Sequence, residues 1–223
     1  CDRTVFYMYE GSTGQQTINA FFRDQRGRDA SEYEIETIYT EKSNTFTQLG
    51  PALPMDGAAD VLRKGGERGY QRVLVTGSGQ RSLVSRLELT FPGVFDWDHI
   101  VWGQDCPIGH GKPHPDPYLM GLRKAMGNTT PVDFRSDDPF GLHLPAEERH
   151  AFTLLPEEAI VIENAPMGVQ AGKAAGIFTV GVNTGPLDPS VLRDAGADIV
   201  LSSMSELAER LDEIIAMANA INA

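Results

Sequence analysis

From residue 56 onwards, short apolar segments alternate with segments of helical pattern, and this alternation constrains the fold more than any other feature. We expect strands at residues 72–76, 99–102, 159–163, 178–182 and 198–201. We expect helices at about 57–68, 80–91, 116–126, 167–175 and 189–195, with a last helix from residue 205. Short strands that alternate with helices imply an α/β fold with a Rossmann-like, doubly wound parallel sheet.

Residues 1–50 contain no β-branched run of strand length, and their apolar residues recur at helical spacing instead. Two stripes with mixed spacings of three and four contain Ile18, Phe21 and Phe22, and then Tyr33, Ile35, Ile38, Tyr39 and Phe46. This periodicity predicts helices. A polar segment at residues 11–14 precedes them, and Gly50-Pro51 ends the unit. We therefore expect a small α-helical domain over residues 1–52 and the α/β domain over residues 53–223.

Residues 128–156 connect an expected helix to the next expected strand, and they are too long for an ordinary connection of this kind. They precede a strand, so they belong at the sheet edge opposite the expected ligand site. We interpret them as a surface insertion in the α/β domain, in preference to an assembly or regulatory element.

The overall composition makes several classes of protein improbable. Of the 223 residues, 41% are hydrophobic and 22% are charged, which is typical of a globular protein. The formal net charge of −12 disfavours nucleic acid and anionic membranes as partners, because both bind clustered Lys and Arg. Cys1 and Cys106 indicate no disulfide framework, and no apolar run approaches the length of a membrane span. We expect a cytoplasmic monomer or weak dimer.

Three segments carry the candidate chemistry, and the first is Thr76-Gly77-Ser78-Gly79. It follows an expected strand and opens an expected helix. A hydroxyl at the strand end, flexible glycines and the free N–H groups of a helix N-terminus form a cradle for phosphate. Dinucleotide binding is the alternative, but the third glycine of that fingerprint falls on Ser82, and Asp96 has no suitable strand end beside it.

The second segment, Gly-Lys-Pro-His-Pro-Asp-Pro-Tyr-Leu at residues 111–119, places Lys112 just before a helix start near Asp116. Prolines restrict the backbone there, so the ammonium group can be directed at the sheet edge, where it would neutralise a phosphoryl group. An isolated lysine is usually a solvated surface charge, but the register with the other two segments favours the functional interpretation. Because Lys112 lies on a connection, we expect its replacement to leave the fold intact.

Two histidines, His110 and His114, flank Lys112. Zinc sites need several clustered Cys or His ligands, and no further Cys or His partner accompanies these two in the sequence. We therefore interpret them as loop histidines rather than as zinc ligands.

The third segment, Ile-Val-Ile-Glu-Asn-Ala-Pro-Met-Gly-Val at residues 160–169, ends an expected strand with Glu163 and Asn164. Carboxylate and amide oxygens at the end of a strand suit Mg²⁺, a hard cation that prefers oxygen ligands. Asn164 could also cap the helix that follows, and the two roles are compatible.

Taken together, these segments resemble motifs II, III and IV of the haloacid dehalogenase (HAD) superfamily, in its β-phosphoglucomutase-like branch, over most of residues 56–205. The resemblance implies a Mg²⁺-dependent phosphohydrolase with an aspartyl-phosphate intermediate and a small phosphorylated substrate. It implies that Thr76 and Lys112 are catalytic and hold the phosphoryl group. Residues 1–50 then resemble the α-helical cap that such enzymes insert after the strand that bears the nucleophile.

The same resemblance implies further site residues, which are assigned by matching this sequence to the motifs of the superfamily. The substrate-binding residues are expected to be Gly77, Ser78, Gly11 and Thr13. The metal ligands are expected to be Glu163 and Asn164, and Glu10 is a further candidate. The superfamily usually has Glu-Asp where this chain has Glu163-Asn164, so the amide removes a charge that Glu10, beside the cap loop, could replace. The alternative is that Glu10 is an ordinary exposed acid.

The cap loop differs from that of a sugar-phosphate mutase. β-Phosphoglucomutases have an arginine there that binds the distal phosphate of the sugar, and this chain has Gly14 at that position. The difference favours a small substrate, including inorganic pyrophosphate, over β-glucose 1-phosphate. A β-phosphoglucomutase-like mutase remains the alternative function.

The Asp-x-Asp-Gly motif that carries the nucleophile in this superfamily is not found in the sequence. Asp56 follows no strand, the Asp96-Trp97-Asp98 doublet precedes one, and Asp2 has no strand before it in this sequence. We expect the nucleophile upstream of Cys1, on a strand between residues 72–76 and 159–163, so the chain alone should be inactive and poorly stable. A non-catalytic relative that has lost its nucleophile is the alternative.

Overall fold

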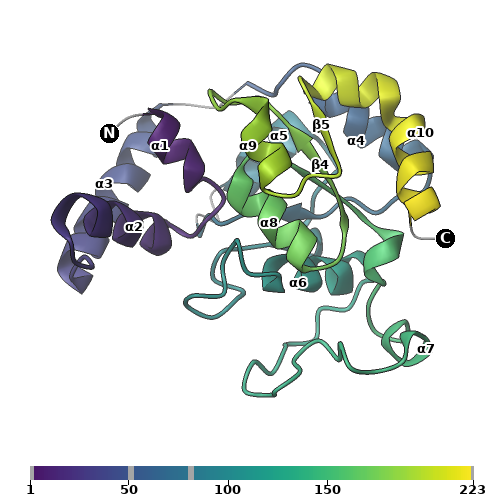
Figure 1. The fold of residues 1–223 in the computed structure, drawn as a ribbon, viewed down its shortest axis with the longest axis horizontal. Coiled ribbons are helices and arrows are strands. Elements are labelled where there is room, and N and C mark those ends of the chain that lie inside the picture. The colour runs from purple at the N-terminus through teal and green to yellow at the C-terminus, as the bar shows by residue number, and fades with distance from the viewer. Residues whose placement is uncertain (1–2, 50–52, 80–82, 222–223) are drawn as a thin grey trace.

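The computed structural model describes residues 3–49, 53–79 and 83–221. Three helices at the N-terminal end lie beside a core of parallel strands and helices (Figure 1). Cys1, Asp2 and the expected turn at Gly50-Pro51 lie outside the described residues. The boundary that we place between residues 52 and 53 lies next to that turn and stays a prediction.

The N-terminal helices are α1 (Arg3–Met8), α2 (Gly14–Arg26) and α3 (Glu32–Gln48). The last two begin with a capping box, in which a hydroxyl accepts the N–H of the third helical residue and that residue's side chain binds the cap in return. Thr13 and Gln16 form the box of α2, and Ser31 and Glu34 form that of α3. The polar segment before the first apolar stripe is therefore the start of α2.

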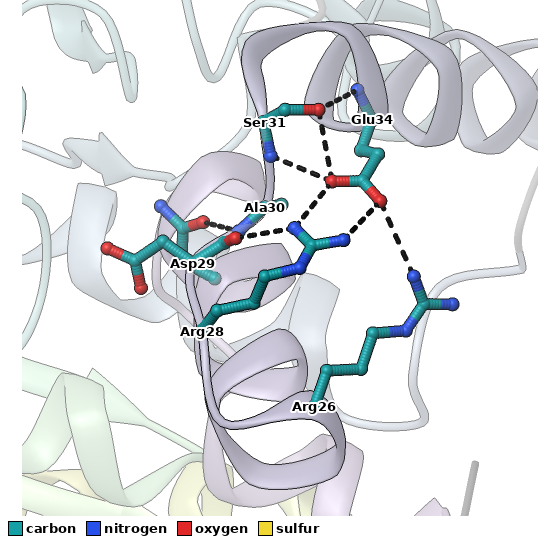
Figure 2. Close-up of polar contacts among 7 residues, drawn as sticks. Arg26, Arg28, Asp29, Ala30, Ser31 and Glu34 are labelled. Carbon is teal, nitrogen blue, oxygen red and sulfur yellow. Dashed lines mark hydrogen bonds and ion pairs between the residues drawn. The ribbon is translucent and has the colours of Figure 1, made fainter.

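The junction between α2 and α3 is held by a network around Glu34 (Figure 2). Arg28 donates two hydrogen bonds of 2.8 Å to the Glu34 carboxylate, and an Nη atom of Arg26 lies 3.4 Å from it. The bonds from Arg28, followed by the backbone N–H of Ser31, lower the pKa of Glu34 to about 2. Because Arg26 and Arg28 are exposed, we expect this network to fix the angle of the two helices more than to add stability.

The strands form two parallel sheets within the described residues. They are β1 (Leu74–Val75), β2 (Ile100–Val101), β3 (Ile160–Glu163), β4 (Phe178–Val182) and β5 (Ile199–Leu201). The first sheet pairs β1 with β2, and the second has the order β3-β4-β5. No backbone ladder joins β1 to β3 in the part of the chain that the structure describes.

Helices cover both faces of the strands, which gives a three-layer α/β core (Figure 1). They are α4 (Ala58–Glu67), α5 (Leu83–Thr90), α6 (Asp116–Ala125), α8 (Pro166–Ala174), α9 (Pro189–Asp194) and α10 (Met204–Ile221). One apolar cluster packs Val61 of α4 and Ile214 of α10 against β4 and β5. A second cluster packs Leu119 of α6 and Ala171 of α8 against β2 and β3. Because the strands of each sheet are parallel, their carboxyl ends lie together at one edge of that sheet.

Residues 128–156 form an extended excursion from the core that includes the short helix α7 (Ala146–Arg149) (Figure 1). The excursion is anchored on α6, because the N–H of Asn128 donates to the carbonyl of Arg123 at 3.0 Å and Phe140 is buried in the cluster around α6. Two single-turn 3-10 helices, η1 (Trp97–His99) and η2 (Pro156–Glu158), precede β2 and β3. None of the helices in the described residues combines the length and the apolar character of a membrane span.

Candidate phosphoryl-binding site

Lys112 connects the two sheets. Its side chain is 5% exposed, and Nζ donates a hydrogen bond of 3.0 Å to the carbonyl of Val75 at the end of β1. The same ammonium group forms an ion pair with Glu163 at the end of β3. A buried lysine held between a carbonyl and a carboxylate is fixed in position, so its charge is available at the edge where both strands end.

Tyr118 completes this arrangement, although the sequence analysis assigned no role to it. Its hydroxyl donates to Glu163 Oε1 at 2.5 Å, and its ring centroid lies 5.0 Å from Lys112 Nζ. Burial, together with the charge of Glu163, raises the pKa of Tyr118 well above its ordinary value, so the hydroxyl stays protonated and can donate. Tyr118 belongs to the segment 111–119 that the sequence analysis singled out, and it lies in the first turn of α6.

The carboxylate of Glu163 lies against the first turn of α8. A Cβ atom on Gly168 would lie 2.0–2.3 Å from that carboxylate, so only glycine leaves room for it there. The backbone N–H of Asn164 donates to Glu163 Oε2 at 3.2 Å. A helix N-terminus attracts a negative charge, so the start of α8 helps to hold the carboxylate of Glu163 in this position.

We expect Gly168→Ala to displace Glu163 and thereby to separate it from Lys112. Overpacking of this kind should lower the free energy of unfolding by about 1–3 kcal/mol, and a misplaced site group should lower kcat by about 10². Gly65→Ala in α4 is the matched control, since nothing lies within 4 Å of a Cβ atom there. That change should stabilise the protein by about 0.5–1 kcal/mol. Thermal denaturation and phosphate release measure both effects, and equal behaviour of the two variants would contradict the prediction.

The loop after β1 carries Thr76, Gly77 and Ser78. The N–H of Thr76 donates to the carbonyl of Val101 at 2.9 Å, and the N–H of Ser78 donates to Thr76 Oγ1 at 3.1 Å. A Cβ atom on Gly77 would lie 2.5 Å from the carbonyl oxygens of Gly11 and Ser12. The loop of the helical cap therefore rests directly on the loop after β1.

The cap loop also contacts the loop of Lys112. Ser12 Oγ donates to the carbonyl of Lys112 at 3.1 Å, and Gly11 has a φ of +90° that favours glycine. Thr13 Oγ1 accepts the backbone N–H of Gln16 at 3.3 Å, so its first role is to cap α2. A small pocket lies between the two loops and is lined by Gly11, Thr13, Thr76, Gly77, Trp102, Gly103, Cys106, Gly111, Lys112 and Pro117.

Glu10 lies at the base of the cap loop with one carboxylate oxygen, Oε2, buried and without a hydrogen-bond partner among the described residues. Burial raises the pKa of Glu10, the carboxylate of Glu163 raises it further, and Lys112 partly opposes this. Glu10 and Glu163 are thus close enough to repel each other, and Lys112 is close to both. The side chain of Glu10 faces the site rather than bulk water.

The structure therefore brings most of the residues predicted from the sequence to one place. Gly11, Thr13, Thr76, Gly77 and Lys112 line one pocket. The backbone N–H of Ser78 bonds to Thr76, and the backbone N–H of Asn164 bonds to Glu163. Glu163 and Glu10 are joined to this pocket through Lys112. The individual roles of these residues stay predictions. A lysine, two carboxylates and a strand-end hydroxyl at one sheet edge can bind a phosphoryl group together with a divalent cation.

The aspartates that the sequence analysis rejected as nucleophiles lie in other kinds of structure. Asp96 Oδ1 accepts from the backbone N–H groups of Asp98 and His99 and caps η1. Asp56 is exposed in a turn before α4. Neither residue lines the pocket at Lys112.

Comparison with known proteins agrees with this geometry. Residues 11–176 match the family described as haloacid dehalogenase-like hydrolase. The chain is 49% identical over 212 residues to 2-deoxyglucose-6-phosphate phosphatase 1 of Saccharomyces cerevisiae. This match covers 91% of this chain and 75% of that protein. It is 27% identical over 186 residues to glycerol-1-phosphate phosphohydrolase 1 of the same yeast, which covers 82% of this chain and 60% of that protein. The chain thus spans less than two thirds of the latter relative.

A solved structure from Bacteroides vulgatus, provisionally assigned as a β-phosphoglucomutase, superimposes with a TM-score of 0.74 at 40% sequence identity. The superposition covers 95% of this chain and 74% of that one. The parallel α/β core and the helical cap are therefore shared with a solved relative.

Proposed function

Because the chain belongs to the haloacid dehalogenase-like hydrolase family, we propose that it provides the phosphoryl-binding site of a Mg²⁺-dependent phosphatase for small phosphorylated sugars or polyols. The observation that carries this proposal is the position of Lys112. A buried ammonium group, ion-paired with Glu163 and bonded to the end of β1, lies in a pocket with Thr76 and Gly77. In that position it can neutralise the charge of a phosphoryl group during transfer.

Each of the neighbouring residues has a proposed part in binding. Thr76 would donate its hydroxyl to a phosphoryl oxygen, and Gly77 and Ser78 would contribute the backbone around it. Gly11 and Thr13 would bound the substrate from the cap side, where Ser12 already ties the cap loop to Lys112. We propose that the attacking carboxylate belongs to an aspartate outside this sequence, on a strand that fits between β1 and β3. A carboxylate nucleophile would divide the displacement into two steps through an aspartyl-phosphate.

The residues present fit a bound Mg²⁺ ion. Glu10 Oε2 is buried without a partner among the described residues, and Glu10 and Glu163 repel each other. Mg²⁺ prefers oxygen ligands, and two carboxylates with the amide of Asn164 supply such ligands. When bound, the ion would stabilise negative charge on the transferring group. Lys112 would then hold the phosphoryl group, and Glu10 and Glu163 would hold the cation.

The substrate class is proposed from the relatives and the cap loop together. The yeast relatives are described as phosphatases of 2-deoxyglucose 6-phosphate and glycerol 1-phosphate, which are a small sugar phosphate and a small polyol phosphate. Gly14 lies in contact with Tyr39 of α3, whose ring atoms would lie 2.6 and 2.7 Å from a Cβ atom on Gly14. A larger side chain at this position would have to displace the ring of Tyr39, so the cap as built favours glycine over arginine there, which supports a monophosphate over a sugar bisphosphate. Pyrophosphate remains a further candidate on the same ground of size.

A substrate panel tests the proposal. Phosphate release from 2-deoxyglucose 6-phosphate, glycerol 1-phosphate, pyrophosphate and β-glucose 1-phosphate should be measured with Mg²⁺, using the protein with its upstream sequence. We expect the highest kcat/KM on one of the first two compounds. Conversion of β-glucose 1-phosphate to glucose 6-phosphate would favour the mutase, and no turnover of any compound would favour the non-catalytic relative.

A further inference from the structure

A second cluster of ligating side chains lies beside the phosphoryl site, on the outer side of the Lys112 loop. It consists of His110, His114 and Asp116, whose ligand atoms all lie within 4.8 Å of one another. His110 Nδ1 is 2.7 Å from Asp116 Oδ2, and His114 Nδ1 is 3.0 Å from Asp116 Oδ1. Both oxygens of one carboxylate therefore face an imidazole nitrogen.

The burial of the three side chains suits an ion that enters from water. The Asp116 side chain is 6% exposed, whereas those of His110 and His114 are 41% and 40% exposed. The carboxylate thus forms the floor of the cluster, and the two imidazoles form an accessible rim. A buried carboxylate at a low local dielectric gains more from a cation than an exposed one does.

The three side chains lie close enough together to share one ion. Zinc binds imidazole nitrogen and carboxylate oxygen at about 2.0–2.2 Å, so neighbouring ligand atoms lie roughly 3.3 Å apart. The two imidazole-to-carboxylate distances, 2.7 and 3.0 Å, are shorter than that separation, so the ligand atoms would move apart by roughly half an ångström or less when an ion binds. Three protein ligands leave a fourth position for water.

One further contact holds His114 against the carboxylate. The backbone N–H of Asp116 lies 3.4 Å from His114 Nδ1, so this nitrogen is held close to Asp116. A lone pair and a carboxylate oxygen repel each other unless a proton or a metal ion lies between them. Binding of a metal would satisfy both groups.

The loop holds these residues in place without an ion. The N–H of His110 donates to the carbonyl of Pro107 at 2.9 Å, and the N–H of His114 donates to the carbonyl of Gly111 at 3.0 Å. The His110 and His114 rings lie 4.4 Å apart, and the ring of Phe134 from the insertion packs against His110 at 6.2 Å. A preorganised site loses little conformational entropy when it binds.

We propose that His110, His114 and Asp116 form a binding site for a transition-metal ion of the zinc type. The site is distinct from the carboxylates at Glu10 and Glu163, because imidazole ligands favour zinc, cobalt and nickel, whereas Mg²⁺ favours sites made of oxygen alone. Lys112 lies between the two histidines in the sequence, so a bound ion fixes the loop on both sides of it.

Calorimetric titration with Zn²⁺ in millimolar Mg²⁺ tests this site, with Co²⁺ as a spectroscopic probe. We expect one equivalent of Zn²⁺ to bind the wild-type protein and Co²⁺ to give the visible absorption of a tetrahedral site. The double variant His110→Ala/His114→Ala should weaken Zn²⁺ binding by more than about 100-fold, since even the outer partners of metal ligands contribute about 10–100-fold. His143→Ala/His150→Ala is the matched control, because both of these histidines lie in the insertion and pair with acids outside the cluster, Asp138 and Glu158 respectively.

Asp116→Asn provides a second test, because it keeps the shape of the floor of the cluster and removes its charge. It should also weaken Zn²⁺ binding, while circular dichroism reports an intact fold. Wild-type protein that binds Zn²⁺ no more tightly than His110→Ala/His114→Ala would overturn the proposal and leave a hydrogen-bonded cluster. Loss of the Zn²⁺ equivalent in His143→Ala/His150→Ala instead would place the ion in the insertion and equally overturn it.

Discussion

Replacement of Lys112 by alanine is expected to lower kcat by about 10²–10³, the usual cost of one electrostatic contact to the transferring group. It should also lower the free energy of unfolding by about 3–5 kcal/mol, because Glu163 would remain buried without its partner. The expectation from the sequence, that the fold would be unaffected, is corrected here by the burial of Lys112. Kinetics of phosphate release and denaturant unfolding measure the two effects separately.

Lys124→Ala is the matched control for this experiment. Lys124 is also a largely buried lysine, whose ammonium group donates to the carbonyl of Ile100 and pairs with Asp105 at 3.1 Å. The Lys124→Ala variant should lose stability as Lys112→Ala does, but it should retain kcat because Lys124 does not line the pocket. If Lys112→Ala retains more than half of the wild-type kcat, Lys112 has no part in the chemistry.

Glu163→Gln and the double variant Lys112→Met/Glu163→Gln separate the ion pair from the catalytic charge. Removing both charges should recover part of the stability that Lys112→Ala loses, since no buried ion is then left unpaired. Activity should not recover with it, because the phosphoryl group would still lack its cation. A double variant with restored kcat would show that the lysine acts only through the fold.

The sequence predicted the regular elements closely because hydrophobic periodicity depends on local residues. The strand expected at residues 178–182 is β4, Phe178–Val182, and the helix expected from residue 116 is α6. The fold class is confirmed by the parallel strands, the helical cap and the match to a solved relative. The ends of the elements were predicted less exactly, since the strand expected at residues 72–76 is paired over only Leu74–Val75. Pairing requires a neighbour, which a local pattern does not contain.

The contacts that build the candidate site depend on tertiary packing, so the sequence predicted its members better than their surroundings. Motif spacing placed Lys112 and Glu163 at one sheet edge, and their ion pair agrees with that placement. It did not reveal that Tyr118 would bind Glu163, because a tyrosine on a helix face is usually part of the core. The interpretation of His110 and His114 as loop histidines overlooked Asp116, the acid that the helix start brings to both rings.

Glu10→Gln is expected to weaken the binding of Mg²⁺ and to stabilise the protein when Mg²⁺ is removed. Burial and the charge of Glu163 raise the pKa of Glu10, so the ionised carboxylate is unfavourable until a cation arrives. Glutamine keeps the size of the side chain and removes that charge. We expect the Mg²⁺ concentration for half-maximal activity to rise by at least about tenfold, as for other weakened metal sites.

The raised pKa of Glu10 also predicts the direction in which the stability of the protein changes with pH. A carboxyl with a raised pKa holds its proton more tightly in the folded state, so stability decreases as pH rises from the ordinary value of 4.5 through the raised pKa. With a chelator present, Glu10→Gln should therefore melt at a higher temperature than the wild type at neutral pH, and the difference should vanish below the ordinary value. Added Mg²⁺ should reverse the order, because only the wild type gains a second carboxylate ligand.

Glu41→Gln, an exposed acid on α3, is the control for the loss of one negative charge. It should leave both the Mg²⁺ dependence and the pH profile of the melting temperature unchanged. If Glu10→Gln behaves in the same way, Glu10 is a buried acid without a metal role, and the ligands must be sought at Glu163 and Asn164 alone. If the chelator-treated Glu10→Gln protein is less stable than the wild type at neutral pH, the repulsion between the two carboxylates is not the dominant interaction at this site. The reversal by Mg²⁺ is the decisive observation, because a purely structural role for Glu10 would change stability equally with and without the ion.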